Sequence, residues 1–333
     1  MSGREARDPG SEPEARGHRR KPKNRGHGKE PKARGPGPET RLRLVSWNVH
    51  GVTGAPRREE RMAVIGRVVA ARRADIVLLQ EVWGQRDAEV FFESLGRVGY
   101  VAVEVPGGVH WPVRTSGLLA FVRSAEGWRA DRIQFHEFQA EAGDWKLWQG
   151  DGLGDKGALG FTLAREGFEL AIWNTHLQAA YRPGDYAEVR RQQLIELRDA
   201  IGADARPTLL AGDLNTTPDE AALGALADFS ELTAPLRERC ACGTSVKEPA
   251  SPEWLDYLFA RSPEGWRIAA EVSLLRNQRP DVPYSDHQGL DAILRITPPT
   301  AEVSLAWLAA ARLAGPTTRR ELLANAALLL LGR

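Results

Sequence analysis

Short apolar runs and longer helical repeats alternate along the middle of the chain. At its start, Leu42 and Leu44 fall on one face of an expected strand, and Val45 and Trp47 fall on the other. This is the two-residue period of a strand, while short continuous apolar runs indicate strands that are buried on both faces. The strand-like segments are 41–49, 74–83, 101–105, 117–122, 158–164, 168–177, 207–215, 254–260, 266–275 and 290–296.

Three segments show the 3.6-residue period of an amphipathic helix. Residues 60–73 place Met62 and Ile65 on one face, and 86–97 and 184–201 follow the same pattern. Strands outnumber helices, and several strands follow one another without a helix between them. The pattern therefore predicts an α/β fold in which two mixed sheets pack together and helices cover them, and not a simple doubly wound fold.

The two ends of the chain differ from this middle part. Residues 1–40 are rich in Gly, Pro, Arg, Lys and Glu and almost free of large apolar side chains, so we expect a disordered basic tail. Residues 298–333 are apolar, with two short helical patterns at 303–313 and 318–331, each too short to cross a bilayer. One folded domain is expected between the tails, over residues 41–297.

The composition and the cysteines bear on where the protein works. With 42% hydrophobic and 27% charged residues, the chain resembles soluble globular proteins. It has no run of 18 apolar residues and no secretory signal pattern. Its two cysteines, Cys240 and Cys242, are one residue apart, a spacing that fits a disulfide poorly, so we expect two ordinary thiols in a reducing compartment. These features predict a cytoplasmic protein.

The net charge of +1 is unevenly distributed. Residues 1–40 hold eleven Lys/Arg and six Asp/Glu, a charge of +5, which leaves −4 for the remainder of the chain. Proteins that bind the phosphate backbone of nucleic acid usually present a basic face. The acidic body argues against duplex DNA as the substrate, although nucleic acid stays open as a partner.

Polar residues stand where the expected strands end. A single Asn, Glu or His in such a place is ordinarily a turn or core residue. A set of acids, amides and imidazoles at the ends of six separate buried segments is harder to explain structurally, and it predicts that they meet in one cleft. The set consists of Asn48, Glu81, His176, Asp213, Asn215, Asp256, Asp286 and His287.

These residue types suit hydrolysis of a phosphate ester. A phosphodiester is anionic and repels hydroxide, and a hard metal ion on oxygen ligands offsets that charge. Glu81 is the expected ligand, with Asn48 and Asp286 beside it. Sparse carboxylates around an open coordination shell favour Mg²⁺, with Mn²⁺ as an alternative.

The other five residues can be given roles in the chemical step. We expect Asp213 to orient or deprotonate the attacking water, and Asn215 to donate to the pentacovalent oxyanion. His287 needs a carboxylate to fix its tautomer, and Asp256 is the natural partner. His176 could bind phosphate or protonate the leaving oxygen.

The chain resembles the endonuclease/exonuclease/phosphatase superfamily over residues 41–297. The resemblance rests on the segments SWNVHG, DIVLLQEV, NTHLQA, AGDLN, LDY and SDHQGL. It implies a four-layer α/β sandwich and a metal-dependent phosphoesterase. It also implies that Asn48 and Glu81 hold metal and phosphate, that His176 faces the phosphate, and that the remaining residues form the water-orienting and acid–histidine pairs.

Within that superfamily, the segments DKGALGF, NTHLQAAY and DYAEVRRQQLIEL are similar to the neutral sphingomyelinase branch. The resemblance implies a lipid phosphodiester substrate and makes Lys156 a phosphate-binding residue. Two other substrates stay open: nucleic acid, cleaved by a nuclease or abasic-site endonuclease, and inositol phosphates or other small phosphodiesters.

A peripheral membrane contact is one interpretation of two further features. Trp111, Trp145 and Trp148 fall in segments that look like loops, and amphipathic rings on loops suit a lipid interface. The apolar segment 298–333 could also lie in an interface. The alternatives are ordinary packing of the tryptophans and docking of the tail on the domain or on a partner.

Overall fold

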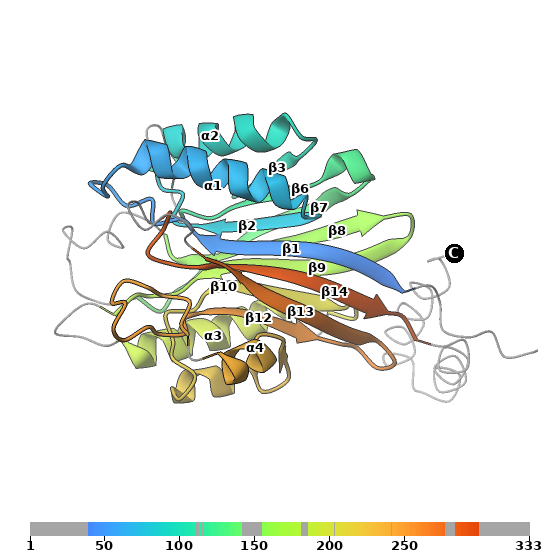
Figure 1. Ribbon diagram of the computed structural model, residues 1–333. Coiled ribbons are helices and arrows are strands. Elements are labelled where there is room, and N and C mark those ends of the chain that lie inside the picture. Colours follow the sequence, from blue (N-terminus) through green and yellow to red (C-terminus); the bar gives the residue numbers. More distant parts are fainter. Residues whose placement is uncertain are drawn as a thin grey trace, which may run out of the picture. The chain divides into compact units, whose positions relative to one another are not determined.

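Two six-stranded mixed sheets stack face to face and carry helices on their outer sides (Figure 1). The computed structural model describes residues 39–110, 113–114, 116–141, 155–180, 186–202, 204–240, 242–276 and 284–299. All of them belong to one compact unit, Arg34–Arg333. The predicted four-layer sandwich is confirmed.

The first sheet has the strand order β13-β14-β1-β2-β6-β3. Its one parallel pair is β1 with β2, and the helix α1 lies between those two strands in the chain. The strands are β1 (Thr40–Asn48), β2 (Ile76–Gln80), β3 (Val101–Glu104), β6 (Leu119–Val122), β13 (Arg267–Leu275) and β14 (Gly289–Thr297).

The second sheet has the order β11-β12-β10-β9-β8-β7. It contains the same strand–helix–strand unit, because β9 and β10 pair in parallel and the helix α3 lies between them in the chain. The strands are β7 (Arg129–Glu137), β8 (Gly157–Arg165), β9 (Phe168–His176), β10 (Thr208–Asp213), β11 (Ser230–Glu231) and β12 (Asp256–Arg261), and a separate two-stranded ribbon consists of β4 (Val109–His110) and β5 (Val113–Arg114).

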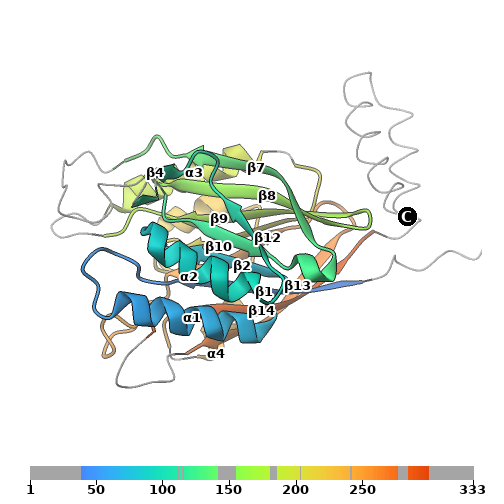
Figure 2. The same cartoon turned by 90° about the horizontal axis from the view of Figure 1, so that it is seen from above.

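Helices cover the outer face of each sheet. On the first sheet, α1 (Arg58–Arg72) and α2 (Gln85–Gly96) lie side by side (Figure 2). On the second sheet lie α3 (Ala187–Ile201), α4 (Ala234–Arg239) and the 3₁₀ helix η3 (Ala221–Leu226), and a shorter 3₁₀ turn, η1, spans Ser124–Glu126. The sequence predicted α1, α2 and α3 to within three residues but gave no sign of the short α4 and η3.

The alternation seen in the sequence decides which layer each side chain joins. Leu42 and Leu44 of β1 lie in the apolar cluster between the two sheets. Val45 and Trp47 lie in the cluster beneath α1 and α2. Burial on both faces explains why these strands read as almost continuous apolar runs, because neither face meets water.

The cysteine prediction is wrong. Cys240 and Cys242 are joined in a disulfide. Their Cα atoms are 5.1 Å apart, a separation that disulfides accept. The two residues therefore give no support to a reducing compartment.

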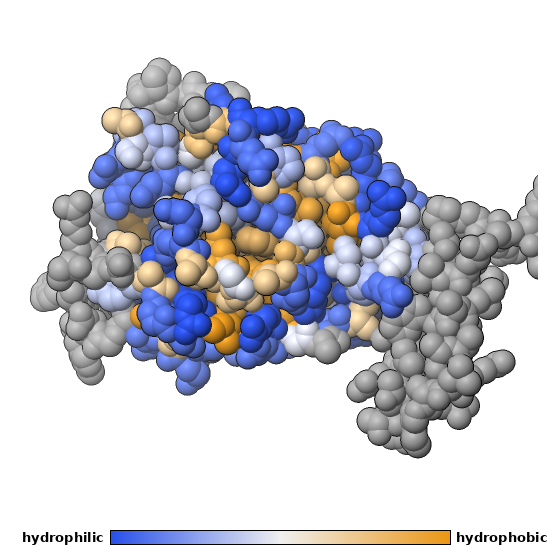
Figure 3. All heavy atoms as spheres, turned by 90° about the horizontal axis from the view of Figure 1, so that it is seen from below, coloured by the Kyte–Doolittle hydropathy of each residue, from blue (hydrophilic) through white to orange (hydrophobic). Residues whose placement is uncertain are grey.

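Several predictions lie outside the described residues. They are the disordered tail over 1–38, the helical tail from residue 300 onward, and Trp111, Trp145 and Trp148. Within the described part of the chain, no helix is long and apolar enough to cross a membrane. On the face seen from below, hydrophobic residues reach the surface in a central area among hydrophilic ones (Figure 3).

Candidate active site

Three functional side chains stand in one row across the second sheet. His176 ends β9, Asp213 ends β10 and Asp256 begins β12. Asp213 is the register partner of His176 on one side and of Asp256 on the other. Residues at equivalent positions on neighbouring strands share one face, so the row follows from the pairing itself.

Gly212 lets β10 approach β9 closely just before this row. Its φ is 147°, and a Cβ atom at this position would collide with the carbonyl oxygen of Thr175. Only glycine lacks that atom. The Gly in AGDLN therefore has a structural purpose: it allows Asp213 to lie beside His176.

The first sheet contributes Asn48 and Glu81 from the ends of β1 and β2. Asn48 is fully buried. Its Nδ2 donates to Glu81 Oε1 at 2.9 Å and to Asp213 Oδ2 at 2.9 Å. Its Oδ1 accepts a hydrogen bond from the backbone N–H of His50 at 3.0 Å. Asn48 thus holds one carboxylate from each sheet, and its amide oxygen is turned toward the backbone.

Glu81 has a backbone conformation that is uncommon for a residue with a side chain. Its φ is 61°, in the left-handed region. Burial, helped by repulsion from the carboxylates of Asp286 and Asp213, raises the pKa of Glu81 to about 7 against the opposing effect of the hydrogen bond from Asn48. Glu81 Oε2 is buried and has no hydrogen-bond partner among the described residues.

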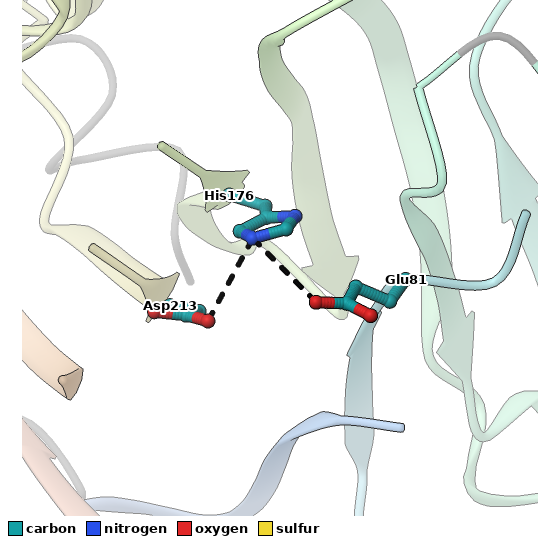
Figure 4. Close-up of side chains that lie close together, drawn as sticks. All are labelled: Glu81, His176 and Asp213. Atoms are coloured by element: carbon teal, nitrogen blue, oxygen red, sulfur yellow. Dashed lines mark ion pairs between the residues drawn. The ribbon is translucent and has the colours of Figure 1, made fainter. Parts of the chain in front are cut away.

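His176 faces the carboxyl groups of Asp213 and Glu81 (Figure 4). Its Nε2 lies 3.7 Å from Asp213 Oδ2 and 3.9 Å from Glu81 Oε1. On the other side of the ring, Nδ1 lies 3.4 Å from the ammonium nitrogen of Lys156. Lys156 is buried and also donates to the carbonyl of Leu177 at 3.2 Å. The lysine that the resemblance identified therefore lies beside the histidine.

His287 and Asp256 form a tight buried pair. His287 Nδ1 and Asp256 Oδ2 are 2.7 Å apart, and His287 Nε2 lies 3.6 Å from Asp213 Oδ2. Burial alone lowers the pKa of His287, but attraction by Asp256 and Asp213 outweighs it and holds this pKa well above its ordinary range. The Nε2 atom of the ring faces Asp213.

Asp213 lies between the two imidazoles. Burial raises its pKa to about 6, with repulsion by Asp256 in the same direction and attraction by His287 opposing it. Its Oδ1 accepts the backbone N–H of Asn215 at 2.9 Å. A carboxyl group that titrates near neutrality can accept a proton from water at the pH of the cell.

The strand that the sequence predicts over residues 207–215 does not extend as far as Asn215. The strand ends at Asp213, and Asn215 has a φ of 48°. The side-chain oxygen of Asp213 takes the backbone N–H two residues on, which turns the chain as Asp and Asn commonly do. Asn215 Nδ2 donates to the carbonyl of Leu177 at 3.1 Å.

Asp286 stands somewhat apart from the other acids. Its Oδ1 lies 3.6 Å from His50 Nδ1, and its side chain is 23% exposed. It acts on Glu81 through its charge but shares no hydrogen bond with it among the bonds of the described residues. His50 was missed in the sequence, where nothing separates it from an ordinary turn residue.

Two other residues that the sequence did not single out fix His287. The indole N–H of Trp47 donates to the carbonyl of His287 at 2.9 Å. The backbone N–H of His287 donates to Ser285 Oγ at 3.0 Å. Ser285 lies in the SDHQGL motif, and its hydroxyl donates to the Asn48 carbonyl at 2.7 Å. It therefore also joins the end of β1 to the segment that precedes β14.

The donor set fits a hard divalent cation. Ligand atoms of Glu81, His176 and Asp213 lie within 4.8 Å of one another, as do those of Asp213, Asp256 and His287. Acids that burial holds at a raised pKa are stabilised in their charged form by a nearby cation. Glu81 Oε2, which has no hydrogen-bond partner among the described residues, and the Asp286 carboxylate are oxygen donors of the kind that a hard divalent cation prefers.

A family model matches residues 45–287, from the strand that bears Asn48 to the histidine of the last motif. The chain belongs to the Endonuclease/Exonuclease/phosphatase family. This confirms the superfamily to which the motifs were assigned.

One curated relative and two solved structures are similar to this family member. Sphingomyelin phosphodiesterase 2 of Homo sapiens is 25% identical over 287 residues, which cover 78% of this chain and 66% of the relative. The chain thus spans about two thirds of that relative's length. This match extends the resemblance to the sphingomyelinase branch.

The two solved structures share the fold. TDP2 of D. rerio, complexed with a single-strand DNA product, has a TM-score of 0.60 and 17% identity, covering 77% of this chain and 99% of that one. A mutant beta toxin of Staphylococcus aureus with bound magnesium ions has a TM-score of 0.57 and 16% identity, covering 76% and 99%. At these identities the likeness concerns the architecture alone.

Proposed function

We propose that this protein hydrolyses phosphodiester bonds with the help of Mg²⁺, and that its substrate is a lipid of the sphingomyelin type. The observation that carries the first part is the convergence of Asn48, Glu81, His176, Asp213 and His287 at one end of the two sheets. Two hydrogen bonds from Asn48 and the shared approach of both histidines to Asp213 hold that group together.

Glu81 and Asp286 are the residues that would hold the cation, and its charge would offset that of the phosphodiester and polarise the scissile bond. Asn48 keeps the Glu81 and Asp213 carboxylates in place through its amide nitrogen. Lys156 and His176 lie together on the side of the second sheet, where they can bind the phosphate oxygens. Mn²⁺ has the same ligand preferences and is the expected substitute.

Asp213 and His287 are placed for the proton transfers. Asp213, with a pKa of about 6, takes a proton from the water that attacks phosphorus. The bond between phosphorus and the lipid-side oxygen breaks, and that oxygen takes up a proton from the imidazole of His287. Asp256 keeps His287 charged and oriented, and Asn215 supplies an amide donor for the crowded phosphorus centre.

The lipid preference is supported by the likeness to a sphingomyelin phosphodiesterase and by the acidic body of the chain. With sphingomyelin, the products would be ceramide and phosphocholine. A peripheral membrane contact through the tryptophan segments and the C-terminal tail, in a cytoplasmic protein, belongs to the same proposal. Hydrophobic residues at the surface of one face are compatible with such a contact (Figure 3).

A nuclease is the second candidate, because the TDP2 structure of the same fold holds single-strand DNA. The two candidates are separated by one assay panel. Purified protein with Mg²⁺ is offered sphingomyelin vesicles, plasmid and single-strand DNA, and a bis-aryl phosphodiester, with the Asp213→Asn variant as the matched control. Cleavage of sphingomyelin that the variant lacks is the expected result, and cleavage of DNA alone would remove the lipid proposal.

Chelation of divalent ions and sedimentation with lipid vesicles complete the test. Removal of divalent ions should stop turnover, and Mg²⁺ should restore it. For the membrane contact, the full chain is mixed with sphingomyelin vesicles and sedimented. Protein that stays in the supernatant at every lipid concentration would contradict a peripheral contact, even if the site proves to be a phosphodiesterase.

A further inference from the structure

Arg61, on the first turn of α1, is a buried arginine that bonds only to backbone carbonyls among the hydrogen bonds of the described residues. Its side chain is 4% exposed. Nε donates to the carbonyl of Pro56 at 3.0 Å, and Nη1 donates to those of Val49 at 3.1 Å and Tyr284 at 2.9 Å. Nη2 donates to the carbonyl of His50 at 2.8 Å. One guanidinium thus ties together segments that lie more than 200 positions apart.

Two of the tied segments carry residues of the site. The carbonyls of residues 49 and 50 directly follow Asn48, and the carbonyl of residue 284 lies two positions before Asp286. A second tie joins the same segments, because Ser285 Oγ donates to the Asn48 carbonyl. All three carbonyls from 48 to 50 are therefore held by side chains from elsewhere in the chain.

The chemistry of the tie suits arginine and no other residue. The planar guanidinium directs five N–H groups in a fixed fork, whereas a lysine offers one nitrogen that cannot span carbonyls on both sides. The charge of Arg61 also interacts favourably with the carboxylates of Asp286 and Glu81. Arg61 thus fixes the backbone on which these acids stand and opposes their mutual repulsion.

We propose that Arg61 is a positioning residue that sets the spacing between the Asn48 turn and the Asp286 turn, and thereby the affinity of the site for Mg²⁺. The inference rests on the proposed function for its metal. It assigns Arg61 no contact with the substrate. Removal of a group that holds a metal ligand in place without touching the metal usually lowers metal affinity or activity by about 10- to 100-fold.

The test compares Arg61→Lys and Arg61→Met with Arg67→Met. Arg67 lies on the same helix but is exposed, and it makes no hydrogen bond or ion pair in the described part of the chain. Binding of Mg²⁺ to the full chain is measured by calorimetry, well below the melting temperature of each variant. We expect both Arg61 variants to bind Mg²⁺ about tenfold more weakly or worse, and Arg67→Met to match the wild type.

Turnover distinguishes positioning from packing. At a Mg²⁺ concentration that only half-saturates the wild type, turnover by the Arg61 variants should fall, and saturating Mg²⁺ should restore it, while KM for the phosphodiester stays near that of the wild type. If Arg61 only stabilises the fold, the variants will melt at lower temperature but bind Mg²⁺ as the wild type does, and this result would overturn the proposal.

Ser285→Ala keeps the test decisive if the Arg61 variants do not fold. It removes the second tie and should weaken Mg²⁺ binding in the same direction by a smaller factor. Unchanged binding in that variant would overturn the proposal. Because calorimetry with Mg²⁺ needs no substrate, a wild-type protein that binds the ion and cleaves nothing would end the proposed function separately. A wild type that binds no Mg²⁺ would end both.

Discussion

Asn48 Nδ2 donates a hydrogen bond of 2.9 Å to Asp213 Oδ2, and this bond joins the two sheets at the site. The residues stand at the ends of β1 and β10, 165 positions apart. The same nitrogen bonds to Glu81, so one amide fixes the distance between the expected metal ligand and the expected base. Both residues are buried, where a lost partner is costly.

Replacement of Asp213 by Asn should remove turnover. The variant has nearly the same shape but cannot accept a proton, so we expect kcat to fall by about 100-fold or more. Initial rates on sphingomyelin vesicles measure this effect, and circular dichroism checks the fold. A folded variant with wild-type rates would show that another group activates the water.

Replacement of Glu81 by Gln should weaken binding of Mg²⁺. The carboxylate carries the unpartnered oxygen of the site, and a neutral amide is a poorer ligand for a hard cation. We expect the Mg²⁺ concentration for half-maximal activity to rise about tenfold or more. Asp75→Asn gives a comparison, because that acid contacts Trp128 and the backbone of β1 away from the site. An unchanged Mg²⁺ requirement in Glu81→Gln would contradict its assignment as a ligand.

Glu81 should also make the metal-free protein less stable as the pH rises. Its pKa of about 7 in the folded state exceeds the ordinary value near 4.3, so between these values the folded state binds more protons than the unfolded state. Its contribution to the free energy of unfolding therefore falls as pH rises through that window. Melting temperatures measured in a chelator from about pH 4.5 to about pH 7 should decline more steeply for the wild type than for Glu81→Gln.

Mg²⁺ provides the control for that measurement. A bound cation stabilises the ionised Glu81, so the difference in slope between the wild type and Glu81→Gln should shrink when Mg²⁺ replaces the chelator. Equal slopes in the chelator would mean that Glu81 is not the source of the decline.

Replacement of Asp256 by Asn should lower the pKa of His287. Attraction by Asp256, across a 2.7 Å contact, is the largest influence that raises this pKa against burial. With that charge removed, the ring should lose its proton at a lower pH, and NMR titration of the imidazole signals in metal-free protein can follow the change. If the His287 signal keeps its titration midpoint, Asp256 does not control its charge.

Replacement of Gly212 by Ala should destabilise the protein by about 2 kcal/mol or more, because the new Cβ atom collides with Thr175 where β9 and β10 pair. Gly224→Ala is the matched control, since no atom lies within 4 Å of a Cβ there. Urea denaturation compares the free energies of unfolding. Equal stability of the two variants would contradict the close approach of the strands.

The sequence by itself determined the layers of the fold and indicated eight candidate residues of the site. Alternating and continuous apolar runs report which faces meet water, and polar residues at the ends of buried strands are conspicuous against them. Asn48, Glu81 and Asp213 could be recognised in this way, because burying a polar side chain costs free energy unless the side chain has a partner or a function there.

Only the tertiary structure decided which atoms face one another. The row of His176, Asp213 and Asp256 depends on the register of three strands, and no local pattern specifies that register. The same holds for Arg61 and Ser285, whose partners lie more than 200 positions away. Periodicity reports the environment of one segment, whereas contacts between distant segments arise only when the sheets pack.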